Sequence, residues 1–330
     1  MSTLIFGGTG FVGLNLVEHL LTKGEQVTIF DKGSMPDDAI EEFNKLPGSF
    51  ELFEGDVRDL DSIAQAMRQS PKSIIYGAAI TSGIERDISD PKSTIEVNLM
   101  GFLNVLECAR GLDSCRIINL SSSGAYGDAA FGNNVLVEAN TDPDPKTIYA
   151  VSKFASERIG TKMGELWKLD VVSVRLSAVF GRWERQTNVR DTPSPLYQIA
   201  SLILKGENVK LSREDCRDWI YAPDIARAVR AVRDAHQLRH SVYNISNGQY
   251  WSALKWGQAF AKHFSGIKCD LSVGQEKPNV ETHTPKERKP LSIERLQQDT
   301  SFVPEYDMDG SVADYYSWLT KPKSQHNRHN

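Results

Sequence analysis

Leu4-Ile-Phe-Gly-Gly-Thr-Gly-Phe-Val-Gly13 stands almost at the start of this chain. The apolar stretch Thr3–Phe6 predicts a strand, and Phe11–Lys23 predicts a helix that begins directly after the glycines. Glycine permits a tight turn and lets backbone N–H groups at a helix N-terminus approach a pyrophosphate. The stretch therefore predicts a dinucleotide-binding turn. Its candidate cofactor contacts are Gly7, Gly10, Phe11, Val12 and Gly13.

A second strand-like stretch, Gln26–Phe30, ends in Asp31. An acidic residue at this point of a dinucleotide-binding unit accepts hydrogen bonds from the adenosine ribose. Its carboxylate would repel a 2′-phosphate, so we expect NAD rather than NADP as the cofactor. Lys32 directly after it supports the NADP alternative, because a lysine can pair with such a phosphate.

The composition limits the class of protein. The chain has 330 residues, of which 40% are hydrophobic and 25% charged, as in globular proteins with a large core. A net charge of −5 without a basic tract argues against nucleic acid or an anionic membrane as a partner. No apolar run approaches the roughly 18 residues of a membrane span, and the early strand leaves no room for a signal peptide. The four cysteines and seven histidines lack metal-ligand spacing, so we expect a cytoplasmic protein without metal.

Strand-like and helix-like stretches alternate through the first half of the chain. Further strands are expected at Phe50–Phe53, Ser73–Tyr76, Arg116–Leu120 and Val171–Arg175, and further helices at Leu60–Gln69, Pro91–Arg110 and Tyr149–Lys168. This alternation predicts an α/β fold with a Rossmann-like, doubly wound parallel sheet and helices on both faces. Ligands of such sheets bind beyond the carboxyl ends of the strands.

After about Phe180 the pattern becomes irregular and rich in proline. Helices are still predicted there at Leu196–Lys205, Pro223–Ala235 and Trp251–His263. We expect residues 1–176 to form the NAD-binding domain and residues 177–330 to form a smaller, mixed substrate-binding lobe. Segments at about 215–245 are expected to return to the first domain, so the lobe is not expected to fold by itself.

Tyr149 and Lys153 lie one helical turn apart and therefore share a helix face. A lysine ammonium favours the phenolate form of a neighbouring tyrosine. At about 4 Å and an effective dielectric constant of about 20, the attraction is roughly 4 kcal/mol, which would lower the phenol pKa from about 10 to about 7. A phenol with that pKa can exchange protons with a carbinol.

The Gly-x-x-Gly-x-x-Gly spacing of residues 7–13, followed by Tyr149-Ala-Val-Ser-Lys153, resembles the extended short-chain dehydrogenase/reductase family. This family is also called the NAD-dependent epimerase/dehydratase family. The resemblance runs from about residue 3 to about residue 320 and implies the same two-lobed fold. It also implies that NAD is the cofactor and that helices Pro91–Arg110 and Tyr149–Lys168 form a homodimer.

The resemblance implies three catalytic residues. Tyr149 would be the acid/base, and Lys153 would both tune it and hold the nicotinamide ribose. Ser122 stands four residues before Tyr126 of the Tyr-Gly pair, as does the family's serine or threonine that donates a hydrogen bond to the reacting oxygen. Ser123 is the alternative for this role and a candidate substrate contact.

The resemblance also implies cofactor contacts after the third and fourth strands. Asp56 and Val57 match a family Asp-Val pair that contacts adenine. Ala78 and Ala79 follow the fourth strand, where small residues let the backbone approach the cofactor, although close packing would explain them equally well. Asn98 matches a family asparagine near the active site.

The two residues that directly follow Ser122 distinguish between the reactions of the family. Dehydratases carry Asp-Glu there and decarboxylases keep the Glu, whereas this chain has Ser123-Gly124. The missing acid–base pair argues against both reactions. Hydride transfer remains, either in a dehydrogenase or reductase, or in an epimerase that oxidises, rotates and re-reduces its substrate.

The substrate positions depart from the family pattern. Sugar-nucleotide members carry an Asn after the sixth strand that helps to hold the diphosphate, and Ala178 stands there in this chain. Arg217 matches a family arginine that could face a phosphate, and Arg288 lies near another family arginine position.

Arg182, Arg185 and Arg190 lie in one stretch between these positions. Arginine forks suit a carboxylate or a phosphate, which favours an acidic substrate such as a sugar acid. The alternative is a solvated loop in which Glu184 and Asp191 pair with the arginines.

We therefore expect an NAD-dependent oxidoreductase that transfers a hydride at a carbinol or carbonyl of a carbohydrate-like, acidic substrate. One alternative is a sugar or nucleotide-sugar epimerase, similar to UDP-glucose 4-epimerase, with tightly held NAD. A remote alternative is a non-catalytic NAD-binding interaction protein. In the expected dimer helix, Leu99, Phe102, Leu103 and Leu106 could equally be core residues.

Overall fold

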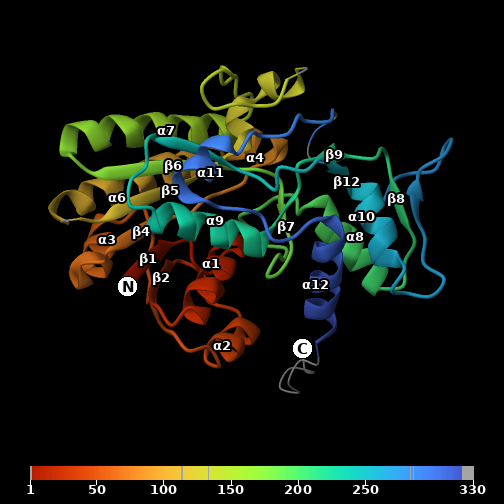
Figure 1. Cartoon of the computed structure of the whole chain (residues 1–330), viewed down its shortest axis with the longest axis horizontal. Helices are drawn as coiled ribbons and strands as arrows, with labels where there is room; N and C mark the ends of the chain where they lie inside the picture. The colour runs from red at the N-terminus through yellow and green to blue at the C-terminus, as the bar shows by residue number, and fades with distance from the viewer. Residues whose placement is uncertain (1, 113, 133, 283, 285, 322–330) are drawn as a thin grey trace.

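The computed structural model describes residues 2–321 except 113, 133, 283 and 285. A seven-stranded parallel sheet in the order β11-β6-β5-β4-β1-β2-β3 forms its centre (Figure 1). The strands are β1 (Ser2–Phe6), β2 (Gln26–Asp31), β3 (Ser49–Glu54), β4 (Ser73–Tyr76), β5 (Arg116–Ser122), β6 (Asp170–Leu176) and β11 (Val242–Ile245). This order runs outward from β1 in both directions, so the predicted doubly wound Rossmann-like sheet is confirmed.

Helices cover both faces of the sheet, so its inner strands are apolar on both faces, whereas the edge strand β3 is partly exposed. In β1, Leu4, Ile5 and Phe6 have no exposed surface, which explains the continuous apolar run in the sequence. One face packs against α1 (Phe11–Thr22), α2 (Asp37–Phe43), α9 (Ala222–Asp234) and α11 (Glu294–Thr300). The other packs against α3 (Leu60–Ala66), α6 (Gly101–Cys108) and α7 (Ile148–Trp167).

The strand β11 was not predicted. Its four residues, Val-Tyr-Asn-Ile, are too few for a periodicity argument, and tertiary pairing with β6 decides their conformation. The helix α9 packs on the sheet and β11 is its edge strand, so the chain returns to the first lobe between residues 222 and 245.

The predicted helix Pro91–Arg110 is broken into pieces. It consists of α5 (Pro91–Ile95), a π-helical turn (Glu96–Met100), α6 and a 3-10 turn (Ala109–Gly111). Phe102 and Leu106 are core residues without exposed surface, so they are not available to a second copy of the chain. The homodimer stays a prediction.

The smaller lobe has a core of its own, to the right of the sheet in Figure 1. Large aromatic side chains dominate it, among them Phe180, Trp219, Trp256 and Phe260. Its elements are β7 (Val179–Phe180), α8 (Pro195–Leu204), β8 (Val209–Leu211), β9 (Cys216–Arg217), β10 (Ile220–Tyr221), β12 (Trp251–Ser252), α10 (Ala253–Ala261), β13 (Cys269–Leu271) and α12 (Met308–Thr320). The division near residue 177 stays a prediction, and the end of the expected lobe, 322–330, lies outside the described residues.

Neither a membrane-spanning helix nor a metal-binding cluster is found among the described residues. None of the helices there is both long and apolar enough to cross a bilayer. The same part of the chain contains no group of three or more His, Cys, Asp or Glu side chains that could hold a metal ion.

The glycine-rich turn is held by contacts that exclude side chains. Gly7 has φ +79°, and a Cβ there would lie 2.6 Å from the amide nitrogen of Ala78 after β4. At Gly13, in the first turns of α1, a Cβ would lie 2.2 Å from the Gly7 carbonyl oxygen. The turn, α1 and β4 can therefore meet only because these two positions lack side chains.

Replacing Gly13 by alanine tests this packing. We expect Gly13→Ala to lose about 1–3 kcal/mol of stability and to bind NAD more weakly, because α1 must shift away from the turn. Calorimetric Tm and titration with NAD measure the two effects. Gly111→Ala is the control, since a Cβ at Gly111 would meet no atom within 4 Å. Unchanged Tm and NAD affinity in Gly13→Ala would show that this contact does not matter.

Candidate active site

The N-terminus of α1 offers hydrogen-bond donors to an anion. Its N-cap residue, Gly10, has no side chain to cap the first N–H groups, and its first turn contains no acidic residue. Beside it, the Asp31 carboxylate accepts hydrogen bonds from Thr9 N–H at 3.0 Å and from Gly33 N–H at 3.1 Å. These bonds hold Asp31 next to the turn, where a dinucleotide would place its adenosine ribose. The residues at this point fit the predicted cofactor.

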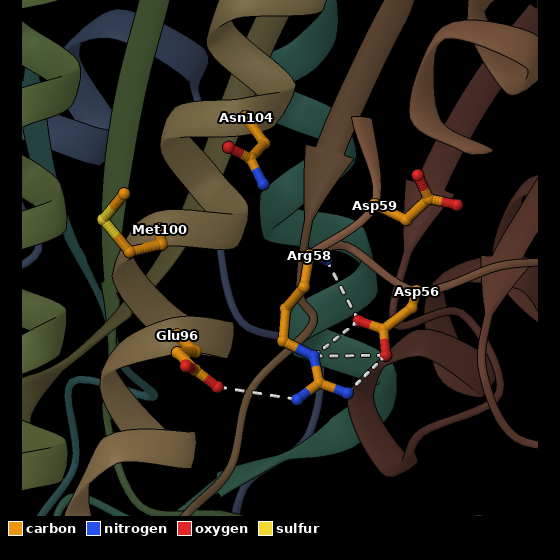
Figure 2. Close-up of a pocket in the computed structure, with 6 residues that line it drawn as sticks. All are labelled: Asp56, Arg58, Asp59, Glu96, Met100 and Asn104. Atoms are coloured by element: carbon orange, nitrogen blue, oxygen red, sulfur yellow. Dashed lines mark hydrogen bonds and ion pairs between the residues drawn. The ribbon is translucent and has the colours of Figure 1, made fainter. Parts of the chain in front are cut away.

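A groove of about 570 Å³ lies past the end of β3 (Figure 2). Arg58 lies between two acids there, with Asp56 2.6 Å and Glu96 3.5 Å from its guanidinium. The hydrogen bonds from Arg58 hold the pKa of Asp56 well below its usual range. Lys32 pairs with Asp56 at 3.2 Å, which draws its ammonium toward the predicted adenine end. The carbonyl oxygen of Val57 is already used, because Asn104 donates to it at 3.0 Å.

Asn98 lies beneath the predicted site rather than in it. It has no exposed surface, and its amide group bonds to both backbone groups of Ile80 and to the Ser152 hydroxyl. Both amide hydrogens are therefore used within the protein, and the contact of Asn98 with the cofactor stays a prediction. The π-helical turn directs Asn98 inward, where it ties the chain after Ala78 and Ala79 to α7.

The three predicted catalytic side chains come from β5 and α7. Ser122 ends β5, and its Oγ accepts a hydrogen bond from Gly124 N–H at 3.0 Å. Hydrogen bonds with Ser122 and with Thr81, which was not predicted, lower the pKa of Tyr149, but burial raises it more. Lys153 lies with its Nζ 6.0 Å from the centre of the Tyr149 ring.

The expected fall of the Tyr149 pKa to about 7 is not found in this structure. Burial of the phenol is the largest effect, and the charge of Arg190 opposes it only in part. The Lys153 ammonium donates instead to the carbonyl oxygen of Leu120 at 2.8 Å. Burial also lowers the pKa of Lys153 to about 8, which weakens it as a source of charge.

A buried network behind Lys153 was not recognised in the sequence. Glu157, one turn further along α7, pairs with Arg175 of β6 at 2.7 Å and accepts a hydrogen bond from Ser121 of β5 at 2.5 Å. The i,i+4 spacing of Lys153 and Glu157 on a helix expected to cover the sheet was the available signal. The network fixes α7 relative to the strand that carries Ser122.

Arg288 connects the smaller lobe to the catalytic end. Its guanidinium donates to Ser123, to Ser177 at 2.7 Å and to Asp218 at 2.7 Å. Ser123 is thereby buried beneath an arginine, next to Ser122. Ala178 offers no polar side chain, and its carbonyl oxygen accepts the Ile220 N–H at 3.0 Å.

Arg217 is buried beside Arg288. It donates to Asp215 and to Thr284, both at 3.0 Å, and its guanidinium lies 5.3 Å from the centre of the Trp219 ring. Burial lowers the pKa of Arg217, and the charge of Arg288 lowers it further although Asp215 opposes this. Two arginines thus lie close together between the smaller lobe and Ser122.

The arginines of the 182–190 stretch do not gather at one substrate site. Arg182 pairs with Asp314 of α12 at 2.5 Å, and Arg190 pairs with Glu184 at 2.9 Å. The predicted alternative of internal pairs therefore holds for Arg190, whereas Asp191 pairs with a residue outside the stretch, Arg86. Asp314 takes both nitrogens of the Arg182 fork, and the interpretation of Arg182 as a substrate contact stays a prediction.

Arg185 points to the glycine-rich turn, where its Nη2 donates to the carbonyl oxygen of Thr9 at 2.7 Å. It therefore lies on the cofactor side rather than with Arg217.

A dinucleotide-binding turn and a buried tyrosine–lysine pair at one sheet edge define an enzyme of the short-chain dehydrogenase/reductase class. The chain belongs to the NAD dependent epimerase/dehydratase family, which matches residues 3–246. The predicted family, enzyme class and cofactor, NAD, are thereby confirmed.

Similar proteins include two curated relatives. CapI of Staphylococcus aureus is 23% identical over 96% of this chain and 98% of its own length. A probable UDP-glucuronate 4-epimerase of Rhizobium meliloti is 26% identical over 72% of this chain and 68% of its own length.

Solved structures share the fold along nearly the whole chain. The UDP-glucuronic acid 4-epimerase of Bacillus cereus, solved with NAD, is 19% identical with a TM-score of 0.79, over 98% of this chain and 99% of that one. The UDP-glucose 4-epimerase of Thermus thermophilus, also solved with NAD, is 25% identical with a TM-score of 0.73, over 96% of this chain and 99% of that one.

The burial of Lys153 has a consequence for stability. Its pKa is about 8 in the folded protein and keeps its usual value of 10.5 in the unfolded chain, so the unfolded chain binds more protons between these values. The unfavourable contribution of Lys153 is therefore complete below about pH 8 and is relieved as the pH rises through 10.5. We expect Lys153→Met to be more stable than the wild type at neutral pH, by up to roughly 3 kcal/mol.

Urea unfolding of the cofactor-free proteins, from neutral pH to above 10.5, measures this difference. The stability advantage of Lys153→Met should shrink across that range. Lys162→Met is the matched control, because Lys162 lies on the same helix with an exposed side chain. An advantage that is independent of pH would contradict the explanation by charge burial.

Proposed function

We propose that this enzyme inverts a hydroxyl-bearing carbon of a nucleotide sugar by oxidising it and reducing it again, with NAD retained. The observation that supports this most is the juxtaposition of two groups of residues. Ser122, Tyr149 and Lys153 can exchange a proton with a carbinol, and Arg288, which contacts Ser123, lies near the buried Arg217. The epimerase names of the similar proteins agree with this assignment.

Tyr149 and Ser122 act at the carbinol oxygen. In its phenolate form Tyr149 accepts the proton of that hydroxyl group, becomes the neutral phenol and returns the proton when the carbon is reduced again, and Ser122 orients the oxygen by a hydrogen bond. When bound, NAD supplies the acceptor for the hydride that leaves the carbinol carbon. The pKa of Tyr149 must fall below the value set by burial for this exchange, and the positive charge of Arg190 acts in that direction.

Arg217 and Arg288 hold the nucleotide part. Arginine forks bind phosphate oxygens in pairs, and a diphosphate would share these two guanidinium groups with Asp215 and Asp218, their carboxylate partners in the protein alone. Arg288 has a buried Nε without a hydrogen-bond partner among the described residues, so it retains a donor for a ligand. Anchoring the diphosphate there leaves the sugar ring free to present its other face to the cofactor.

The absence of an acid–base pair favours this reaction over water loss. Ser123 and Gly124 occupy the two positions after Ser122, and neither can protonate a leaving hydroxyl or remove a proton from carbon. The arrangement supports hydride transfer alone.

The second candidate is a dehydrogenase that releases NADH. Ala178 favours it, because the amide expected in a nucleotide-sugar enzyme is missing and a smaller acidic carbohydrate would not need it. A cytoplasmic location likewise stays a prediction.

Incubating the protein with UDP-glucose or UDP-glucuronate and NAD separates the two candidates. An epimerase converts each sugar into its epimer at one carbon and accumulates almost no free NADH. A dehydrogenase releases NADH in proportion to the sugar consumed. No reaction with nucleotide sugars, but oxidation of free sugar acids, would contradict the epimerase proposal.

Tyr149→Phe tests the catalytic assignment. We expect the turnover rate to fall by about 10²–10⁴-fold, since the proton acceptor is lost, whereas NAD affinity should change by less than about twofold. Tyr316→Phe is the control, because Tyr316 stacks on His263 in the smaller lobe. Full activity in Tyr149→Phe would rule out the proposed role, and loss of both activity and NAD binding would point to a structural one.

A further inference from the structure

The 182–190 stretch lies against the glycine-rich turn and the first residues of α1. Asn15 of α1 donates to the carbonyl oxygen of Arg182 at 2.7 Å. Arg185 donates to the carbonyl oxygen of Thr9 at 2.7 Å, and the Arg190 guanidinium lies 5.4 Å from the centre of the Phe11 ring. A segment that follows the turn by more than a hundred residues thus borders the predicted diphosphate position.

The three arginines of this stretch differ in how their charge is compensated. Arg182 has the carboxylate of Asp314, and Arg190 has that of Glu184. The hydrogen-bond partner of Arg185 in the described part of the chain is a neutral carbonyl oxygen. Its other terminal nitrogen, Nη1, is buried and has no hydrogen-bond partner there.

The surroundings of Arg185 do not compensate for the cost of burying its charged guanidinium group. Desolvation lowers the pKa of Arg185, and the more distant attraction of Asp38 and Asp31 compensates only in part. A desolvated guanidinium with an unused N–H group is costly unless an anion completes it. The turn it contacts is the place where the N-terminus of α1 prepares a site for an anion.

We propose that Arg185 is a cofactor-binding residue that donates its unused N–H group to the diphosphate of the dinucleotide. It adds a full positive charge to a turn whose other donors are backbone N–H groups and the Thr9 hydroxyl. Because Arg185 lies on the segment that leads into the smaller lobe, the dinucleotide joins that segment to α1. The proposal rests on the NAD dependence of the family and not on the nature of the substrate.

Binding of cofactor fragments tests the proposal without a substrate. Cofactor-free wild type, Arg185→Gln and Arg185→Lys are titrated with ADP-ribose, which carries the diphosphate, and with adenosine, which does not. We expect Arg185→Gln to weaken ADP-ribose binding by about tenfold or more and to change adenosine binding by less than about twofold. Arg185→Lys should recover part of the loss, because it keeps the charge without the fork.

Ionic strength provides a second readout. The affinity of the wild type for ADP-ribose should fall with added salt more steeply than that of Arg185→Gln, because a cation has been removed. Arg239→Gln is the control for net charge, since Arg239 is exposed and pairs with Asp299 far from the turn. Thermal unfolding of every variant shows whether the fold is retained.

Three results would overturn the proposal. Unchanged ADP-ribose affinity in folded Arg185→Gln would exclude a diphosphate contact. Equal losses for adenosine and ADP-ribose would mean that the substitution merely distorts the turn. Unchanged fragment binding, with a raised KM for UDP-glucuronate but not for UDP-glucose, would assign Arg185 to an acidic group of the substrate.

Discussion

The buried ion pair between Glu157 and Arg175 determines where the catalytic groups lie. Glu157 belongs to the helix that carries Tyr149 and Lys153, and Arg175 belongs to the sheet. Neither charge reaches solvent, so each requires the other, and removing one partner alone would leave a costly isolated charge. The bond from Ser121 to Glu157 extends this restraint to the strand of Ser122. The helix can therefore neither slide nor rotate without breaking a desolvated network.

Burial also explains the electrostatic state of the site. It raises the pKa of Tyr149, which keeps the phenol neutral, and it lowers the pKa of Lys153 to about 8, so that Lys153 still carries its charge at neutral pH but loses it more readily than an exposed lysine. Two guanidinium groups lie near them, and each is paired with a carboxylate: Arg190 with Glu184, and Arg288 with Asp218.

Much of the architecture could be predicted because local pattern and tertiary role agree. The inner strands β1, β4, β5 and β6 are buried along most of their length, which explains their apolar runs, whereas the edge strand β3 is partly exposed. The broken helix around Asn98 could not be predicted, because the π-helical turn arises from a buried polar side chain that bonds to Ile80 and Ser152.

The sequence by itself determined the dinucleotide-binding turn, the sheet and the Tyr149–Lys153 pair, because each depends on spacing along one segment. Only the tertiary structure decided the roles of the arginines, because an arginine's function depends on which carboxylate lies within reach of its long side chain. Asp314, more than a hundred residues away, occupies Arg182, whereas Arg185 meets a carbonyl oxygen and keeps a donor. Pairing between distant segments leaves no periodic signal in the sequence. The sequence therefore cannot tell an arginine that supports the fold from one that can bind a ligand.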